Sequence, residues 1–271
     1  MENSVLFLSE NREMNFRISI LGFVVGLLVG LTGMGSGALM TPALILLGLA
    51  RPVIAVGTDL VWGTLTKAVG AFVHCRQKTV DYRVVKLLAF GSVPGALAGL
   101  ALLAHLHKYG VEAVDRIIVR MLAIALICVA LSLFVRTLRG QKLQIEVSNE
   151  GLIQRTPPWL TSVLGAVVGF LVSLTSVGSG SVIVACLVVL YPASPMKRIV
   201  GSDILHALIL VGISALGHLG MGSIDVPLLG ALLVGSIPGI WIGSKMSAVF
   251  PERILQPILA TTLLFLGYKL L

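Results

Sequence analysis

The sequence predicts an all-α polytopic membrane protein that consists of two structural repeats. Three observations support this prediction: an apolar composition, charges confined to short clusters, and a second half that repeats the motifs of the first. Of the 271 residues, 56% are hydrophobic and only 12% are charged. A soluble domain cannot cover that much apolar surface, because roughly half of its residues must face water.

Eight apolar runs have the length or the flanks of membrane crossings. About 20 apolar residues span the ~30 Å hydrocarbon core, and Arg or Lys at the ends of shorter runs can reach the interface. The runs are Ile18–Ala50, Val53–His74, Leu87–Ala104, Met121–Val135, Trp159–Pro192, Ile204–Gly217, Val226–Ser244 and Ile254–Tyr268.

Other composition-based classes do not fit. The first 17 residues carry three Glu and two Arg and precede a run too long for a cleavable signal peptide. The net charge of +8 is better explained as orientation charge on loops than as nucleic-acid binding. The three cysteines form no CxxC pair, so neither a disulfide framework nor a zinc site is expected, and no cofactor is predicted.

The second half of the chain matches the first at a nearly constant offset. Segments 26–37 and 169–180 are identical at 8 of 12 positions. After one inserted residue, an offset of 144 aligns Val56-Gly-Thr-Asp-Leu60 with Val200-Gly-Ser-Asp-Ile204, His74 with His218, Asp81 with Asp225, and Gly91-Ser-Val-Pro-Gly95 with Gly235-Ser-Ile-Pro-Gly239. We therefore predict a first membrane repeat over 18–136, a polar linker over 137–159 and a second repeat over 160–271, as in many transporters.

The charge distribution favours inverted repeats. Each repeat opens with about 33 apolar residues interrupted by glycines, whereas two full crossings need about 40. If this segment is a helix–break–helix hairpin, three further crossings per repeat make the repeats inverted. The loops of one side then carry 12 Lys and Arg against 7 on the other, which places both termini outside. If the segment crosses once, the counts are 11 and 8, so that alternative stays open.

The glycine-rich interruptions are candidate anion sites. Broken backbone is tolerated in a bilayer where it is buried in protein or lines a cavity, and a half-helix that begins there presents free N–H groups and a positive dipole end. The alternative is close helix packing through small residues such as Gly22, Gly26 and Gly30. The predicted substrate-binding residues at the breaks are Thr32, Gly35, Ser36, Gly37, Thr175, Gly178, Ser179 and Gly180.

The second crossing of each repeat supplies ionisable side chains, which are functional candidates at membrane depth. Lys67 is predicted to bind the anion, with a structural ion pair to a carboxylate of the opposite repeat as the alternative. The proton-coupling candidates are Asp59, His74, Asp203, His206 and His218. Helix N-capping is the alternative role for the two Asp residues, and interfacial hydrogen bonding is the alternative for the two His residues at helix ends.

Together these motifs resemble the TauE/SafE family of sulfite and organosulfonate exporters, also called the toluene sulfonate uptake permease family. The resemblance covers about residues 18–271. It rests on segment 30–37, on Val56–Leu60 with Lys67 and His74, on Thr79-Val-Asp81, and on the two Gly-Ser-[Val/Ile]-Pro-Gly elements, whose prolines we interpret as kinks. The second glycine segment departs from the first, since Ser173 and Ser176 replace Gly30 and Gly33. The resemblance implies a carrier of sulfur-containing anions in the bacterial inner membrane.

We therefore expect a secondary transporter, an exporter of sulfite or an organosulfonate, that binds its anion at the broken helices near the midplane. Its expected partners are the small anionic substrate and the lipid bilayer, with no nucleic acid, and a homo-oligomer is compatible with the sequence. A passive anion channel, or a carrier of another anion such as a carboxylate, is the alternative. An intramembrane hydrolase is not expected, because Met34 and Val177 stand where a Gly-x-Ser-Gly motif needs glycine.

Overall fold

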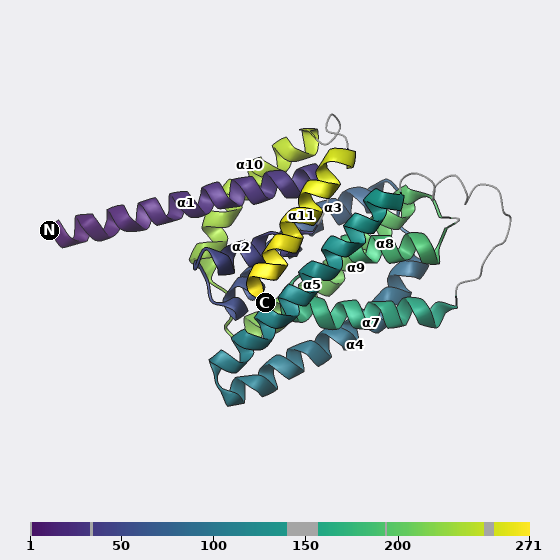
Figure 1. Ribbon diagram of the computed structural model, residues 1–271, viewed down its shortest axis with the longest axis horizontal. Helices are drawn as coiled ribbons and strands as arrows, with labels where there is room; N and C mark the ends of the chain where they lie inside the picture. Colours follow the sequence, from purple (N-terminus) through teal and green to yellow (C-terminus); the bar gives the residue numbers. More distant parts are fainter. Residues whose placement is uncertain (1, 33–34, 140–156, 193, 247–251) are drawn as a thin grey trace.

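The computed structural model describes residues 2–32, 35–139, 157–192, 194–246 and 252–271 (Figure 1), and all regular elements in these ranges are helices. This confirms the predicted all-α fold. Residues 140–156 of the predicted linker and the side chain of Ser36 lie outside what is described. The helices are α1 (Glu2–Thr32), η1 (Ser36–Ala38), α2 (Met40–Leu46), α3 (Pro52–Arg76), α4 (Tyr82–Leu106), η2 (His107–Tyr109), α5 (Val111–Arg139), α7 (Pro158–Thr175), α8 (Ser181–Leu190), α9 (Met196–Gly220), α10 (Val226–Met246) and α11 (Glu252–Leu270).

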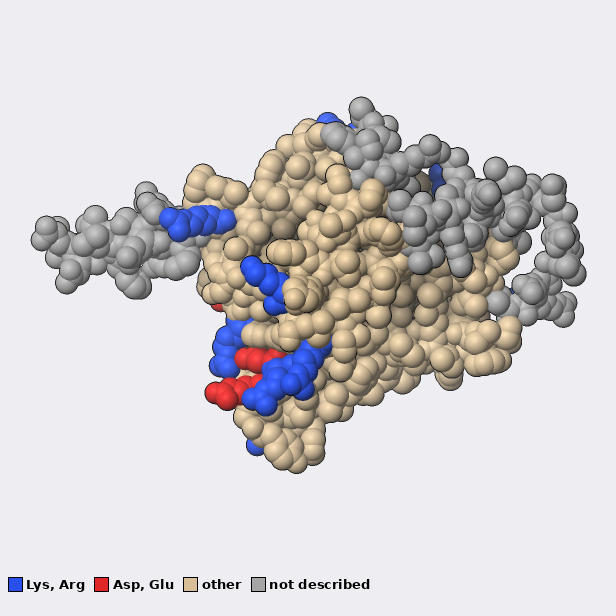
Figure 2. Space-filling view, in the orientation of Figure 1, with Lys and Arg blue, Asp and Glu red and all other residues tan. Residues whose placement is uncertain are grey.

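Six of the described helices are long and apolar enough to cross a membrane. They lie within α1, α4 with η2, α5, α7, α9 and α10. Helix α3 is not among them, although its 25 residues reach ~38 Å. Large apolar side chains in the middle of helices, such as Phe90, Leu216 and Val234, are exposed, as expected for lipid-facing positions. On the face shown in Figure 2, charged side chains gather mainly over the turn between α4 and α5.

Local signals fix where the second and third long helices of each repeat begin. Pro52 occupies the first turn of α3, where its missing N–H is not needed. The carboxylate of Asp81 accepts hydrogen bonds from the N–H groups of Arg83 (3.0 Å) and Val84 (3.4 Å) and so caps α4. Asp225 accepts from the N–H of Leu228 (2.9 Å) at the start of α10 in the same way.

The two repeats pack through exchanged helix pairs. Helix α1 lies along α10, and α4 lies along α7. Glycines bring these backbones together. A Cβ on Gly26 would lie 2.6 Å from the carbonyl oxygen of Ser236, and a Cβ on Gly91 would overlap the carbonyl oxygen of Ser162. The Gly-Ser-x-Pro-Gly elements thus serve helix contact, and Pro94 and Pro238 lie inside continuous helices.

Helices α3 and α9 lie side by side and run in opposite directions. The N–H of Asp225, after the end of α9, donates to Thr58 Oγ1 near the start of α3 (3.1 Å). At the other end, the N–H of Asp81 donates to Ser202 Oγ near the start of α9 (2.8 Å). These two bonds join residues that the offset of 144 makes equivalent, so the matched helices of the two halves are antiparallel, as inverted repeats require.

Candidate functional site

The second glycine segment interrupts the helix with backbone conformations that L side chains rarely adopt. Residues 176–180 connect α7 to α8, and Ser176, Gly178 and Gly180 have φ angles of 61°, 115° and 122°. Helix α8 then begins after Gly180, and no side-chain cap is seen there among the described residues. Its first N–H groups and the positive end of the helix dipole are therefore available to a negative charge.

The same segment doubles back on itself. The hydroxyl group of Tyr191, which follows α8, hydrogen-bonds with Thr161 in the first turn of α7 at 2.7 Å. The end of α8 thus returns to the beginning of α7. Helix α8 has 10 residues, or ~15 Å, and cannot span the hydrocarbon core alone. Helices α7 and α8 therefore form a hairpin.

The two glycine segments touch each other. A Cβ atom on Gly35 would lie 2.5 Å from the carbonyl oxygen of Ser179, and one on Gly180 would lie 3.4 Å from the backbone nitrogen of Gly35. A Cβ on Gly37 would overlap the backbone of Ser176. We call these five residues the break contact. Only glycine permits so close an approach of two backbones.

Ionisable side chains from both repeats surround the break contact. A Cβ on Gly35 would lie 3.3 Å from Lys67 Nζ, and one on Gly180 would lie 4.0 Å from Asp203 Oδ2. Lys67 interacts electrostatically with Asp203 most strongly and then with Asp59. It also lies within electrostatic range of His206. We call Asp59, Lys67, Asp203 and His206 the ionisable cluster.

The two carboxylates of this cluster do not cap helices, so that alternative is wrong. Asp59 is the eighth residue of α3 and Asp203 the eighth of α9, because both helices begin further upstream than the Gly-Thr and Gly-Ser signals suggested. Asp59 is fully buried and accepts a hydrogen bond from Thr41 Oγ1 at 2.7 Å. Asp203 is 4% exposed, and its Oδ1 has no hydrogen-bond partner in the described part of the chain.

His206 and Trp62 occupy equivalent positions at the offset of 144. Trp62 Nε1 donates to Ser236 Oγ at 2.6 Å, and His206 Nε2 pairs with Ser92 Oγ at 2.8 Å. The indole thereby uses its only polar atom. The imidazole keeps a second nitrogen, Nδ1, which is buried and has no hydrogen-bond partner among the described residues.

The other two predicted histidines, His74 and His218, lie away from the break contact, at the ends of α3 and α9. His74 Nδ1 hydrogen-bonds with Thr79 Oγ1 at 2.8 Å. His218 uses both ring nitrogens, toward Ser223 Oγ (3.0 Å) and the carbonyl oxygen of Ser173 (2.9 Å). This geometry favours hydrogen bonding at the helix ends over the proton-coupling role predicted for the two side chains.

Three further predicted residues, Thr32, Thr175 and Gly178, have contacts within their own helix or hairpin. The hydroxyl of Thr32 donates to Leu28 O (2.7 Å), and that of Thr175 donates to Leu171 O (2.7 Å), one turn back in each helix. The nearest neighbours of a Cβ on Gly178 would be Val172 and Val168 of its own hairpin, at 3.7 and 4.0 Å.

Sequence reasoning did not find Thr41 or Ser92 as partners of the cluster. For Ser92 a signal exists, because the serine recurs as Ser236 inside the matched Gly-Ser-x-Pro-Gly elements. For Thr41 the sequence carries no such signal, since its pairing with Asp59 depends on how α2 folds back toward α3.

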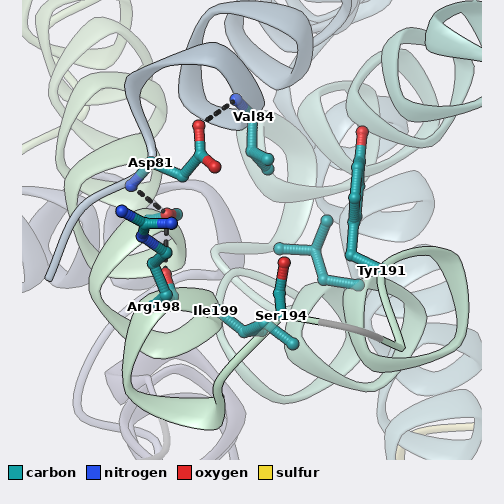
Figure 3. Close-up of a pocket in the computed structure, with 8 residues that line it drawn as sticks. Asp81, Val84, Tyr191, Ser194, Arg198 and Ile199 are labelled. Carbon is teal, nitrogen blue, oxygen red and sulfur yellow. Dashed lines mark hydrogen bonds between the residues drawn. The ribbon is translucent and has the colours of Figure 1, made fainter. Parts of the chain in front are cut away.

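Two cavities lie at opposite ends of α9. Figure 3 shows one of about 10 Å³ near its first turns, where Asp81 bonds to Ser202 and where Arg198 and Tyr191 contribute to the lining. The other, of about 170 Å³, lies beyond its last turn and includes Arg51, His107 and Ser223. Neither cavity is lined by the break contact or the ionisable cluster.

Comparison with known proteins identifies the family. A family model described as "Sulfite exporter TauE/SafE" matches residues 18–270. The chain belongs to the TauE/SafE sulfite exporter family. This TauE/SafE chain is a membrane transporter, a multi-pass protein of the bacterial inner membrane, as the sequence predicts. No solved structure matches it.

Relatives of the TauE/SafE chain from Bacillus subtilis (strain 168) match over nearly their whole length. "Probable membrane transporter protein YjnA" is 42% identical over 258 residues, which cover 95% of this chain and 100% of the relative. "Probable membrane transporter protein YunE" is 26% identical, with 93% and 95% covered. "Probable membrane transporter protein YdhB" is 24% identical, with 94% and 99% covered.

Proposed function

We propose that the protein is a secondary exporter of a small sulfur-containing anion, sulfite or an organosulfonate, which binds where the two glycine segments meet. The observation that carries this proposal is the position of Lys67 Nζ beside Gly35, at the point where Gly35 approaches Ser179 and Gly180. One ammonium group, the uncapped start of α8 and backbone N–H groups converge there. Each of them favours a negative charge.

The donors at the break contact suit a compact anion. The backbones at the break contact are too close for any side chain beyond glycine, so a ligand would be held by N–H groups and the Lys67 ammonium. Sulfite and the sulfonate head group present three oxygens as acceptors for such donors. Because the contact joins the two repeats, relative motion of the repeats would open it.

We further propose that the repeats 18–136 and 160–271 form inverted units that rock about this contact, with export following from alternating access. The antiparallel course of α3 and α9 supports the inversion, and so do the exchanged pairs α1–α10 and α4–α7. The hydrogen bonds of Asp225 to Thr58 and of Asp81 to Ser202 join the repeats at opposite ends of α3 and α9. We expect one bond to break in each of the two access states.

The test is counterflow in proteoliposomes. Vesicles with purified protein are loaded with excess unlabelled sulfite, methanesulfonate, sulfoacetate or acetate, and entry of labelled methanesulfonate is measured without an ion gradient. A carrier for sulfur anions accumulates label transiently when the lumen holds sulfite or a sulfonate, and saturates with concentration. Gly230→Ala serves as a folding-matched control, because nothing lies within 4 Å of a Cβ at that position.

Three outcomes would contradict the proposal. Flux that neither saturates nor shows counterflow would indicate a passive channel. Acceleration by acetate alone would indicate a carboxylate carrier. Full counterflow after Lys67→Met would show that the anion does not bind at the break contact. Export is tested separately, by efflux of preloaded label from intact cells.

A further inference from the structure

The strongest unassigned feature is a buried carboxylate placed where a substrate anion would bind. Asp203 Oδ2 lies beside the residue that precedes α8, at 4.0 Å from a Cβ on Gly180, and Asp203 is the carboxylate with which Lys67 interacts most strongly. Asp203 therefore already has the two features of the proposed anion site, the ammonium group and the start of a helix. An incoming anion would compete with it for both.

The charges of the cluster make this competition unfavourable while Asp203 is ionised. One ammonium group faces two carboxylates, so the fixed charge is negative before any substrate arrives. A further anion in a buried site would add repulsion that water cannot screen. If one carboxylate takes up a proton, the positive charge of the ammonium group and the negative charge of the remaining carboxylate cancel. An anion can then approach.

The surroundings of the two carboxylates decide which one takes the proton. Asp59 is held as an acceptor by the hydroxyl of Thr41, which stabilises its charged form. The counterpart of Thr41 is Val184 at the offset of 143 or Ala185 at the offset of 144, and neither side chain can donate a hydrogen bond. No hydroxyl group of the described residues bonds to Asp203, whose Oδ1 has no hydrogen-bond partner among them, and burial without a donor favours the neutral acid.

We propose that Asp203 takes up one proton each time an anion binds and releases it on the other side, so that anion and proton move together. Export by this route runs down the outward gradient of the anion itself, because the inward proton gradient opposes it. The inference rests on the proposed function. The proton comes from the solvent on the side of binding and forms the O–H of a neutral carboxyl group. When the anion leaves, the carboxyl group returns the proton to the solvent and again faces Lys67.

No other charged group in the elements packed around Asp203 offers an alternative site. Helix α3 contributes Lys67 and Asp59, and α9 itself contributes His206 one turn away. The other charged residues and histidines of these two helices lie near their ends: His74 and Arg76 in α3, and Lys197, Arg198 and His218 in α9. Helices α7 and α8 contain no Asp, Glu, Lys, Arg or His. In α4, Arg83 and Lys86 lie within the first five residues and His105 in the last turn, and the residue that reaches the cluster is Ser92.

The experiment measures anion and proton entry in the same vesicles. Methanesulfonate is the probe, because it stays ionised at all pH values used and cannot itself carry a proton. Proteoliposomes with a trapped pH dye and clamped membrane potential receive an inward gradient of the labelled probe. We expect the wild-type lumen to acidify with one proton per anion. Asp203→Asn is expected to abolish proton entry and to remove the pH dependence of anion exchange. Gly230→Ala, which adds a methyl group where nothing lies within 4 Å, is the control and is expected to keep the wild-type ratio of protons to anions.

The two readouts separate this inference from the proposed function. Saturable anion entry by the wild type without acidification would overturn proton coupling and leave the sulfonate carrier intact. Wild-type stoichiometry in Asp203→Asn would overturn the assignment to Asp203. Absence of anion entry with every probe would overturn the proposed function itself, and the inference with it. The wild-type measurement is decisive even if a variant does not fold.

Discussion

Substituting Gly35 by alanine tests the break contact with the smallest possible change. Gly35 is not one of the glycines with positive φ, so alanine can adopt its backbone conformation. The added Cβ, however, would lie 2.5 Å from the carbonyl oxygen of Ser179 and 3.3 Å from Lys67 Nζ. The first neighbour is backbone and cannot rotate away. The two glycine segments must therefore move apart.

The size of the effect follows from that distance. Unstrained carbon–oxygen contacts lie at about 3.3 Å or more, so the segments must separate by roughly 0.8 Å. Overpacking of this kind costs about 1–3 kcal/mol, and a domain of this size loses about 2–4 °C of Tm per kcal/mol. The shift also displaces the N–H groups from Lys67. Since misplacement by about 1 Å can cost two orders of magnitude in a positioned site, we expect methanesulfonate to bind roughly 10- to 100-fold more weakly.

The assay is a titration of purified protein in detergent, with melting temperature and affinity measured on the same samples. Gly230→Ala is the matched control, because its Cβ meets nothing within 4 Å and alanine favours the helix by about 0.5–1 kcal/mol. We expect this control to bind normally and to melt at the same or a higher temperature. Wild-type affinity and Tm in Gly35→Ala would refute the close approach of the two segments.

Three other substitutions or labels test separate parts of the structure. Lys67→Met should weaken anion binding by on the order of 100-fold, because two unit charges ~5 Å apart interact by about 3 kcal/mol at an effective dielectric of about 20. A lower Tm with unchanged affinity would instead support a structural ion pair with Asp203. His218→Ala should lower the stability by about 2–4 kcal/mol, because it removes a buried ring bonded through both nitrogens, and an unchanged Tm in thermal melts would contradict this. Accessible tags at the C-terminus and in the loop 221–225 should report outside and a tag in the linker inside, whereas a cytoplasmic C-terminus would exclude the predicted orientation.

The sequence was sufficient to predict the helices and the residues that interrupt them. Long apolar runs have few alternatives to helix in a membrane, and glycine clusters inside such runs mark broken backbone. The helix boundaries were less predictable. The apolar run Met121–Val135 became the much longer α5, because charged residues near the interface continue a helix that hydropathy alone would end.

The sequence also placed the candidate ionisable residues on the second long helix of each half, but it could not assign their partners. Helical spacing puts Asp59, Lys67 and His74 on one stripe, yet Lys67 reaches the break contact and His74 bonds to Thr79 at the helix end. Which part of a stripe faces the other repeat depends on how the helices cross. The alternative in which Asp59 caps the N-terminus of its helix was wrong, because the helix begins earlier, at Pro52. Proline is common in the first turn of a helix, so the sequence did contain this signal.

The residues most suited to function are those in which the two repeats differ. Residues at matched positions have the same structural role. Asp81 and Asp225 each cap a helix, and each forms a hydrogen bond with the opposite repeat. Two residues of the ionisable cluster break this pattern, because Val211 stands opposite Lys67 and Trp62 stands opposite His206. The fold therefore accepts an apolar or indole side chain at the matched positions, and a half-buried lysine or a half-bonded imidazole is not needed to build it. Since ionisable groups in a membrane carry a cost in stability, the presence of Lys67 and His206 in one repeat each favours the proposed role toward a ligand.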